Sequence, residues 1–144
     1  MYKSVNFKTS KRVATYPKAK RVNRPEFIVK GYAYDQKGKL RYRVQQYNPY
    51  TQKYVAGKKG YITASAKYVK PAYYVSVPKS KQITVINKNG VNAYRKARLA
   101  NKVTHYKQKT TLSVKKVVKY NLATRYQLTN GHFVTANKKF VIQK

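Results

Sequence analysis

Residues 124–135 carry the clearest fold signal in the chain and read Thr124-Arg125-Tyr126-Gln127-Leu128-Thr129-Asn130-Gly131-His132-Phe133-Val134-Thr135. Apolar and polar side chains alternate through Tyr126-Gln127-Leu128, as in a strand that has one buried face. The Asn130-Gly131 pair predicts a tight hairpin turn of type I′, in which both central residues have positive φ. This stretch therefore predicts two antiparallel strands, at 124–129 and 132–135.

The pattern occurs twice in the chain. Four blocks of the first half resemble four blocks of the second half in the same order: Lys11–Tyr16 and Asn101–Tyr106, Phe27–Lys30 and Leu112–Lys115, Arg41–Val44 and Arg125–Leu128, Tyr61–Val69 and Phe133–Val141. We therefore expect one repeat at 1–70, a linker at 71–79 and a second repeat at 80–144. Extra polar residues at 45–60 in the first repeat predict a surface loop insertion.

Val, Tyr, Thr and Ile dominate the patterned segments of both repeats, and these residues favour strands. The second repeat is expected to hold strands near 82–87, 91–95, 102–106, 112–120, 124–129, 132–135 and 139–142. A second tight hairpin with a type I′ turn is predicted at Asn89-Gly90, and a further turn at 35–38. The sequence thus predicts an all-β protein in which each repeat is a small antiparallel β-barrel.

The first repeat begins at Tyr2, which aligns with Tyr94, so it lacks a counterpart of the strand at 82–87. We expect from this that the chain is truncated on its N-terminal side.

The inward positions of both barrels are predicted from the alternation of apolar residues. They are Val13, Phe27, Val29, Tyr42, Val44, Tyr61 and Tyr68 in the first repeat, and Val103, Leu112, Val114, Val117, Tyr126, Leu128, Phe133 and Phe140 in the second.

Charge is the other dominant feature of the chain. It has 34 Lys and Arg residues against two acidic residues, a net charge of +32. Residues 1–70 hold 18 basic and two acidic residues, and residues 71–144 hold 16 basic residues and none that is acidic, so each half carries +16. The charge belongs to the repeat and not to a tail, and it predicts a polyanionic ligand.

The same composition argues against catalysis. There is no Cys, there are two His, and Glu26 and Asp35 are the two carboxylate side chains. Thiolate zinc sites, carboxylate-bound cations and acid–base catalysis all draw on residues that are absent or scarce here. We expect no enzyme, no metal and no cofactor. No apolar run approaches the roughly 18–20 residues of a membrane span.

The second repeat resembles a known family. Asn92-Ala93-Tyr94 followed by basic residues, then Lys102-Val103 and Thr110–Val114, is similar to the cell-wall-anchoring repeats of S-layer proteins from lactic-acid bacteria. Residues 124–141 resemble a related repeat of surface adhesins from the same bacteria. The resemblance covers most of 80–143 and, more weakly, 1–70.

This resemblance implies two tandem SH3-like barrels that attach a secreted surface protein noncovalently to a Gram-positive cell wall. The implied ligand is teichoic or lipoteichoic acid, and the implied location is extracellular, in the cell wall or S-layer. A lattice or adhesin domain is expected in the same full-length chain. The 45–60 insertion departs from the family pattern and puts ligand binding by the first repeat in question.

Candidate binding residues follow from this ligand. Cations on a strand that are two residues apart project to one face about 6.6–6.8 Å apart and can follow successive phosphates. The expected cations are Lys30, Arg41, Arg43, Lys67, Lys70, Arg95, Arg98, Lys102, Lys115, Lys116, Lys119, Arg125, Lys138 and Lys139. The expected aromatic contacts to sugars are Tyr47, Tyr50, Tyr54, Tyr73, Tyr74 and Tyr120.

Other interpretations stay open at this level. The Lys runs also fit a solvated face, and Arg125 and its counterpart Arg41 also fit structural packing across Tyr rings. Basic charge with interleaved aromatics fits a nucleic-acid-binding β-barrel, although Lys outnumbers Arg by 26 to 8. An adhesin domain that binds anionic host glycans shares the same electrostatics.

Overall fold

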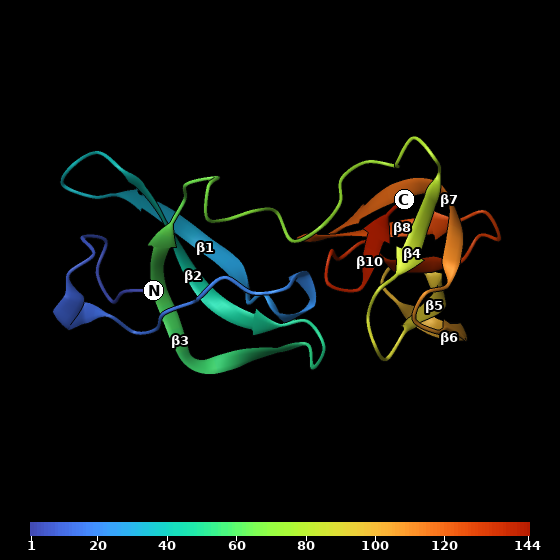
Figure 1. Cartoon of the computed structure of the whole chain (residues 1–144), viewed down its shortest axis with the longest axis horizontal. Helices are drawn as coiled ribbons and strands as arrows, with labels where there is room; N and C mark the ends of the chain where they lie inside the picture. The colour runs from blue at the N-terminus through green and yellow to red at the C-terminus, as the bar shows by residue number, and fades with distance from the viewer. The chain divides into compact units, whose positions relative to one another are not determined.

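The computed structural model describes residues 1–144 and is all-β, as predicted, with ten strands and two short 3-10 turns. It divides into two compact units. The first unit is Met1–Ala19 with Arg24–Lys70, and the second is Lys20–Asn23 with Pro71–Lys144. Each unit has its own sheet (Figure 1).

The first unit contains a three-stranded antiparallel sheet in the order β1-β2-β3. Its strands are β1 (Glu26–Tyr34), β2 (Leu40–Asn48) and β3 (Lys53–Thr63), and the 3-10 turn η1 is Thr9–Lys11. The predicted turn at 35–38 joins β1 to β2, and the Gly38 amide donates to the Asp35 carbonyl at 2.9 Å. β3 is strongly curved along its length (Figure 1).

The 45–60 insertion is not the surface loop that the sequence predicts. Most of it extends the β2–β3 hairpin, because β2 continues to Asn48 and β3 begins at Lys53. Tyr47 lies opposite Tyr54, and their rings meet edge to face with centroids 5.8 Å apart. Such aromatic pairs across strands stabilise a hairpin, which explains why a polar, Gly-containing stretch forms strands here.

The second unit contains a seven-stranded sheet in the order β10-β4-β7-β8-β9-β5-β6. Its elements are η2 (Arg21–Asn23), β4 (Gln82–Val85), β5 (Val91–Lys96), β6 (Ala100–Tyr106), β7 (Thr111–Tyr120), β8 (Ala123–Leu128), β9 (Phe133–Thr135) and β10 (Val141–Gln143). All seven predicted strands of this repeat are present, with ends shifted by one or two residues.

The two Asn-Gly turns differ from their prediction. Gly131 has φ 85° while Asn130 has negative φ, so the β8–β9 hairpin is present but its turn is not type I′. At Asn89-Gly90 no hairpin forms, because β4 pairs with β10 and β7 and not with β5. In both turns only the Gly adopts the left-handed conformation, as its missing Cβ allows.

The pairing registers show that the two units repeat one strand arrangement. Val29 pairs with Val44 in the first unit, and the equivalent Val114 pairs with Leu128 in the second. Arg41 pairs with Thr63 as Arg125 pairs with Thr135. The register shift after Val29 in β1 recurs after Val114 in β7. Strands β1-β2-β3 therefore correspond to β7-β8-β9.

The N-terminal segment takes part in the same arrangement. Tyr2 forms isolated bridges with Arg12 and Tyr61, and the equivalent Tyr94 pairs with Lys102 and Phe133. Residues near Tyr2 and Arg12 thus take the places of β5 and β6, although they form single bridges and no full strands.

The predicted core is partly confirmed. Leu112, Val114, Tyr126, Leu128 and Val44 are buried, and the second-unit core also takes Ile83, Val85, Val91, Ala93, Val134, Ala136 and Val141. The other predicted inward residues are half-buried: Val13, Phe27, Tyr42, Tyr61, Val117, Phe133 and Phe140.

Three predicted core residues are exposed. Val103 is 39%, Val29 51% and Tyr68 70% exposed. Val103 is on β6, the last strand in its sheet, and Val29 is on the edge strand β1. Tyr68 follows the end of β3 and belongs to no strand. Alternation identifies the face of a residue, but burial also requires a neighbouring element.

Residues 71–79, expected as a linker, belong to the second unit. Tyr73 bridges Asn137, and the Tyr74 amide donates to the Ala136 carbonyl at 3.0 Å. Tyr74 and Val77 pack against the core. The segment thus forms part of the packing of the second unit.

Candidate functional site

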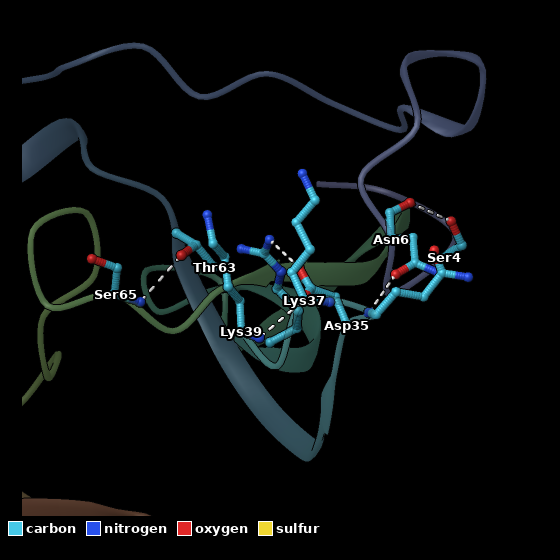
Figure 2. A network of polar contacts seen from close by, with 9 residues as sticks. Ser4, Asn6, Asp35, Lys37, Lys39, Thr63 and Ser65 are labelled. Atoms are coloured by element: carbon cyan, nitrogen blue, oxygen red, sulfur yellow. Dashed lines mark hydrogen bonds and ion pairs between the residues drawn. The ribbon is translucent and has the colours of Figure 1, made fainter.

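The carboxylate of Asp35 has a structural role, because it accepts hydrogen bonds within the β1–β2 turn (Figure 2). Its Oδ1 accepts the backbone amides of Lys37 and Lys39 at 2.9 and 2.8 Å, and its Oδ2 accepts Arg41 Nη2 at 2.7 Å. These donors, led by the Lys39 amide, hold the pKa of Asp35 below its ordinary value. Asp35 is therefore an ionised turn residue.

Glu26 is the other carboxylate, half-buried on β1. It lies near Tyr50, whose pKa is raised first by burial and second by the charge of Glu26. Two carboxylates can neutralise at most two of the 34 cations. The cationic surface of both repeats therefore stays uncompensated.

Ten of the fourteen predicted cations are exposed, as a polyanion site requires. They are Lys30, Arg43, Lys67, Lys70, Arg95, Arg98, Lys102, Lys115, Lys116 and Lys119. Those of the second repeat lie on β5, β6 and β7 or just beyond β5.

The first unit has an open groove of about 420 Å³ that gathers cations. It is lined by Lys3, Val13, Lys30, Arg43, Val44, Gln45, Gly57, Lys59, Gly60 and Tyr61. We call this the Lys30–Arg43 groove. Four cations surround an apolar floor, and no acidic residue lines it.

Contacts within this groove orient its cations. Arg43 Nη2 donates to the Lys30 carbonyl at 3.0 Å. Lys30 Nζ donates to the Tyr54 hydroxyl and lies 4.7 Å from the centre of that ring. The predicted cations Lys30 and Arg43 thus meet in one groove, and the predicted aromatic Tyr54 contacts it.

Sequence reasoning missed Lys3 and Lys59 as groove residues. Lys59 lies in the 45–60 insertion, on the strand segment that pairs with Gln45. Lys3 is next to Tyr2, which bridges β3. Neither residue lies in a recognisable sequence motif. The alignment of Tyr2 with Tyr94, a residue of a predicted strand, could have indicated that Lys3 lies beside the sheet.

Arg41 is not the free surface cation that the sequence predicts. Besides its ion pair with Asp35, its guanidinium lies 3.9 Å from the centre of the Phe7 ring. Its side chain is 13% exposed. Arg41 is therefore a structural residue that ties the β1–β2 turn to the N-terminal segment.

Its counterpart Arg125 is also held by the fold. Nε donates to the Ala97 carbonyl at 3.2 Å and Nη1 to the Thr124 carbonyl at 3.1 Å. The guanidinium lies 5.9 Å from the centre of the Tyr120 ring. At both Arg41 and Arg125, structural packing against an aromatic ring describes the side chain better than ligand binding does.

The predicted pair Lys138 and Lys139 is largely covered. Lys139 is 8% exposed, and its amide donates to Asn137 Oδ1 at 2.8 Å. Lys138 is half-buried, with its ammonium 5.2 Å from the centre of the Tyr74 ring. Lys139 does not belong to an exposed binding surface, because the turn after β9 folds it inward.

The predicted sugar contacts divide in the same way. Tyr50, Tyr54 and Tyr120 are 43%, 46% and 37% exposed, whereas Tyr47, Tyr73 and Tyr74 are half-buried. The Tyr74 hydroxyl accepts a hydrogen bond from Arg21 Nη1 at 2.7 Å, and its ring packs near Tyr126. The prediction of an exposed ring for stacking on sugars is therefore wrong for Tyr47, Tyr73 and Tyr74.

The structure contains no group of three His, Cys, Asp or Glu side chains that could hold a metal ion. None of its helical segments has the length and apolar character needed to cross a membrane.

The fold and the cationic groove together define a small all-β protein with a basic, uncompensated surface. Residues 73–141, within the second unit, match a family model described as "Domain of unknown function (DUF5776)". No curated protein and no solved structure matches the chain. The first unit lies outside the matched residues and is related to them through the internal repeat.

Proposed function

We propose that this chain is a noncovalent cell-wall-binding module of a bacterial surface protein of the S-layer type, located outside the cell. In this proposal it binds teichoic or lipoteichoic acid electrostatically and anchors the protein to a Gram-positive wall. The observation that carries the proposal is that both repeats expose cations while the two carboxylates can offset only two of them.

We further propose that each unit is a variant of a small SH3-like barrel, in tandem. The shared registers of β1-β2-β3 and β7-β8-β9, and the register shift that both units have at the same position, support a common ancestral module. Tandem modules that engage one long polymer bind more tightly than either alone, because the second contact is intramolecular.

The chemistry of the exposed cations supports a flexible polyphosphate ligand. Lys carries a mobile point charge, whereas Arg suits planar and bidentate recognition, and Lys predominates here. Two of the Arg residues, Arg41 and Arg125, are used by the fold, which shifts the exposed charge further toward Lys. A polyol-phosphate chain offers repeated single charges and no bases to read.

The Lys30–Arg43 groove supplies a specific contact in this proposal. Its cations would bind phosphates, and its apolar floor would cover the carbon chain of a polyol or sugar unit. The exposed ring of Tyr54 beside Lys30 is available for stacking.

The groove is tested by binding of purified lipoteichoic acid to the variant Lys30→Gln, Arg43→Gln, Lys59→Gln. A control variant, Lys8→Gln, Lys11→Gln, Lys18→Gln, removes the same charge from exposed residues that do not line the groove. We expect at least about tenfold weaker binding for the groove variant than for the control. Equal loss in both variants would show that net charge acts without a groove.

Competition separates the ligand classes in the same assay. Lipoteichoic acid should displace labelled lipoteichoic acid at a much lower concentration of anionic groups than single-stranded DNA or heparin does. If DNA competes better, the chain is a nucleic-acid-binding protein; if heparin does, an adhesin for anionic glycans is favoured.

A further inference from the structure

A β-bulge occurs at the same position of both units, and its extra residue is Lys in both. In β1 the register shift leaves Lys30 without a partner on β2. In β7 the equivalent shift leaves Lys115 without a partner on β8. A bulge of this kind re-aims the side chains near it and is often found beside functional sites. The bulge lysine of each repeat is therefore a candidate contact for a ligand.

The bulge of β7 places two cations next to each other on the outer face of the sheet. Neighbouring residues of a regular strand point to opposite faces, so a residue two places after the buried Val114 would point inward. Lys116 is at that place, yet it is exposed, as is Lys115. Val117, which follows, packs against the core. The extra residue of the bulge thus turns Lys116 outward beside Lys115.

The first unit also has a second cation at its bulge, but the opposite strand supplies it. The residue equivalent to Lys116 is Gly31, which has no side chain and pairs with Arg43 of β2. A Cβ on Gly31 would lie 3.2 Å from Arg43 Nη2, so the guanidinium occupies the space beside the bulge. The same Nη2 donates to the Lys30 carbonyl at 3.0 Å. The residue of β8 equivalent to Arg43 is Gln127, which is uncharged and pairs with Lys116.

Both units therefore have a second cation beside the bulge lysine, although different strands supply it. We call Lys30 with Arg43, and Lys115 with Lys116, the bulge pairs. Two like charges side by side repel each other, and the second unit has no acidic side chain that could offset them. Packing alone gives no reason for this second charge in either unit, whereas a bound anion would turn the repulsion into attraction.

We propose that each bulge pair binds a phosphate group of a phosphodiester chain, so that the two repeats hold two phosphates of one polymer. This inference rests on the proposed function and adds a binding site in the second unit, at Lys115 and Lys116. Two cationic side chains beside one phosphate can donate charge-assisted hydrogen bonds to different oxygens. Because the pairs occupy equivalent positions, the two repeats bind the polymer in the same way.

The test measures binding of the full chain to purified lipoteichoic acid and, separately, to inorganic polyphosphate. The variant Lys115→Gln, Lys116→Gln removes the bulge pair of the second unit. The control variant Lys88→Gln, Lys107→Gln removes the same charge from exposed residues between strands of that unit. We expect the bulge-pair variant to bind both polymers at least about tenfold more weakly than the control, since it loses charge-assisted hydrogen bonds.

An exchange of strands separates the bulge pair from net charge. Lys116→Gly alone should weaken binding. Adding Gln127→Arg reproduces the arrangement of the first unit and should restore binding to within about threefold of the wild type, because coupled neighbours compensate each other. Adding Leu122→Arg to Lys116→Gly restores the same charge at an exposed residue of the β7–β8 turn and should not restore binding. Heteronuclear NMR spectra check that each variant is folded.

Equal binding by the bulge-pair variant and its control would overturn the proposal, and so would equal rescue by Leu122→Arg and Gln127→Arg. Either result would mean that net charge acts alone, and strong wild-type binding to lipoteichoic acid would still support the proposed function. The expected variant pattern on polyphosphate, with no binding to lipoteichoic acid, would support the bulge pairs and overturn the proposed function. A wild-type chain that binds neither polymer would contradict both.

Discussion

A polar side chain of this protein can be buried where other groups of the fold satisfy its hydrogen bonds. Tyr126 is fully buried, and its hydroxyl donates to the Ser76 carbonyl at 3.2 Å and accepts Gln143 Nε2 at 3.0 Å. Burial raises its pKa to about 12. A Tyr can thus be fully buried among the Val, Ile and Leu residues of the core because its hydroxyl is satisfied.

Asp35 gives the first unit a defined acid sensitivity. Its pKa is lowered from the ordinary value of 3.8 in the folded state, so its contribution to stability is present above that pH. The contribution is lost as the pH falls through the folded pKa. We expect the melting temperature of the β1–β2 region, followed by NMR, to fall as the pH is lowered below about 4.

Asp35→Asn should start with a lower melting temperature at pH 6, because Arg41 loses its ion pair, and should show little further fall on acidification. Glu26→Gln is the matched control and should retain the fall. If Asp35→Asn and the wild type lose stability in parallel, Asp35 is not the responsible group.

Gly90 and Gly131 form a matched pair in the second unit, with φ 70° and 85°. A Cβ on Gly90 would lie 2.2 Å from the Tyr106 carbonyl oxygen and 2.6 Å from His105 Nε2, whereas a Cβ on Gly131 would meet nothing within 4 Å. Both alanine variants incur the cost of positive φ, about 1–2 kcal/mol. Gly90→Ala should cost about 1–3 kcal/mol more, because a neighbour must also move.

Urea unfolding of the two glycine variants measures this difference. Equal destabilisation of the two variants would contradict this prediction. It would mean that β6 moves away from the added methyl group with no loss of unfolding free energy.

At the scale of elements, equivalent strands have different surroundings. β1 and β7 share their register and their register shift, but β7 is covered by β4 and β1 is an edge. The sequence repeat therefore identifies the strands correctly without identifying what covers them.

Equivalent valines measure this difference directly. Val114→Ala should destabilise the second unit by about 2 kcal/mol, since its side chain is buried. Val29→Ala should change the stability of the first unit by less than about 0.5 kcal/mol. Chemical denaturation with residue-resolved NMR separates the two units, and a large cost at Val29 would show that β1 is covered in solution.

Much of the strand layout could be predicted from the sequence because it depends on local alternation and on the repeat. The turn type at Asn130-Gly131 could not, because the Leu128 amide donates to the His132 carbonyl and closes a three-residue loop in which only Gly131 has positive φ. Site prediction failed where a cation finds a partner distant in sequence, as Arg41 does with the Phe7 ring. Lys30 and Arg43 are exposed on their strands, as a surface cation should be, and their role in binding stays a prediction.

For the whole molecule, charge and fold give a consistent picture. The hydrophobic core residues of both units are neutral, Lys139 is a buried charged residue beside the core, and the ionised turn residue Asp35 is held by its own loop. The 34 cations therefore lie mostly at the surface of two related units, each half carrying +16. We expect such a surface to attract long polyanions and the attraction to weaken as salt screens it.

The central claim is tested most directly by pull-down of the full chain on purified Gram-positive cell walls, before and after chemical removal of teichoic acid. We predict strong binding to intact walls that falls steeply as salt rises from about 0.05 to 0.5 M, and near-complete loss on stripped walls. Equal binding to stripped and intact walls would contradict the account and would indicate peptidoglycan or a neutral polysaccharide as the ligand.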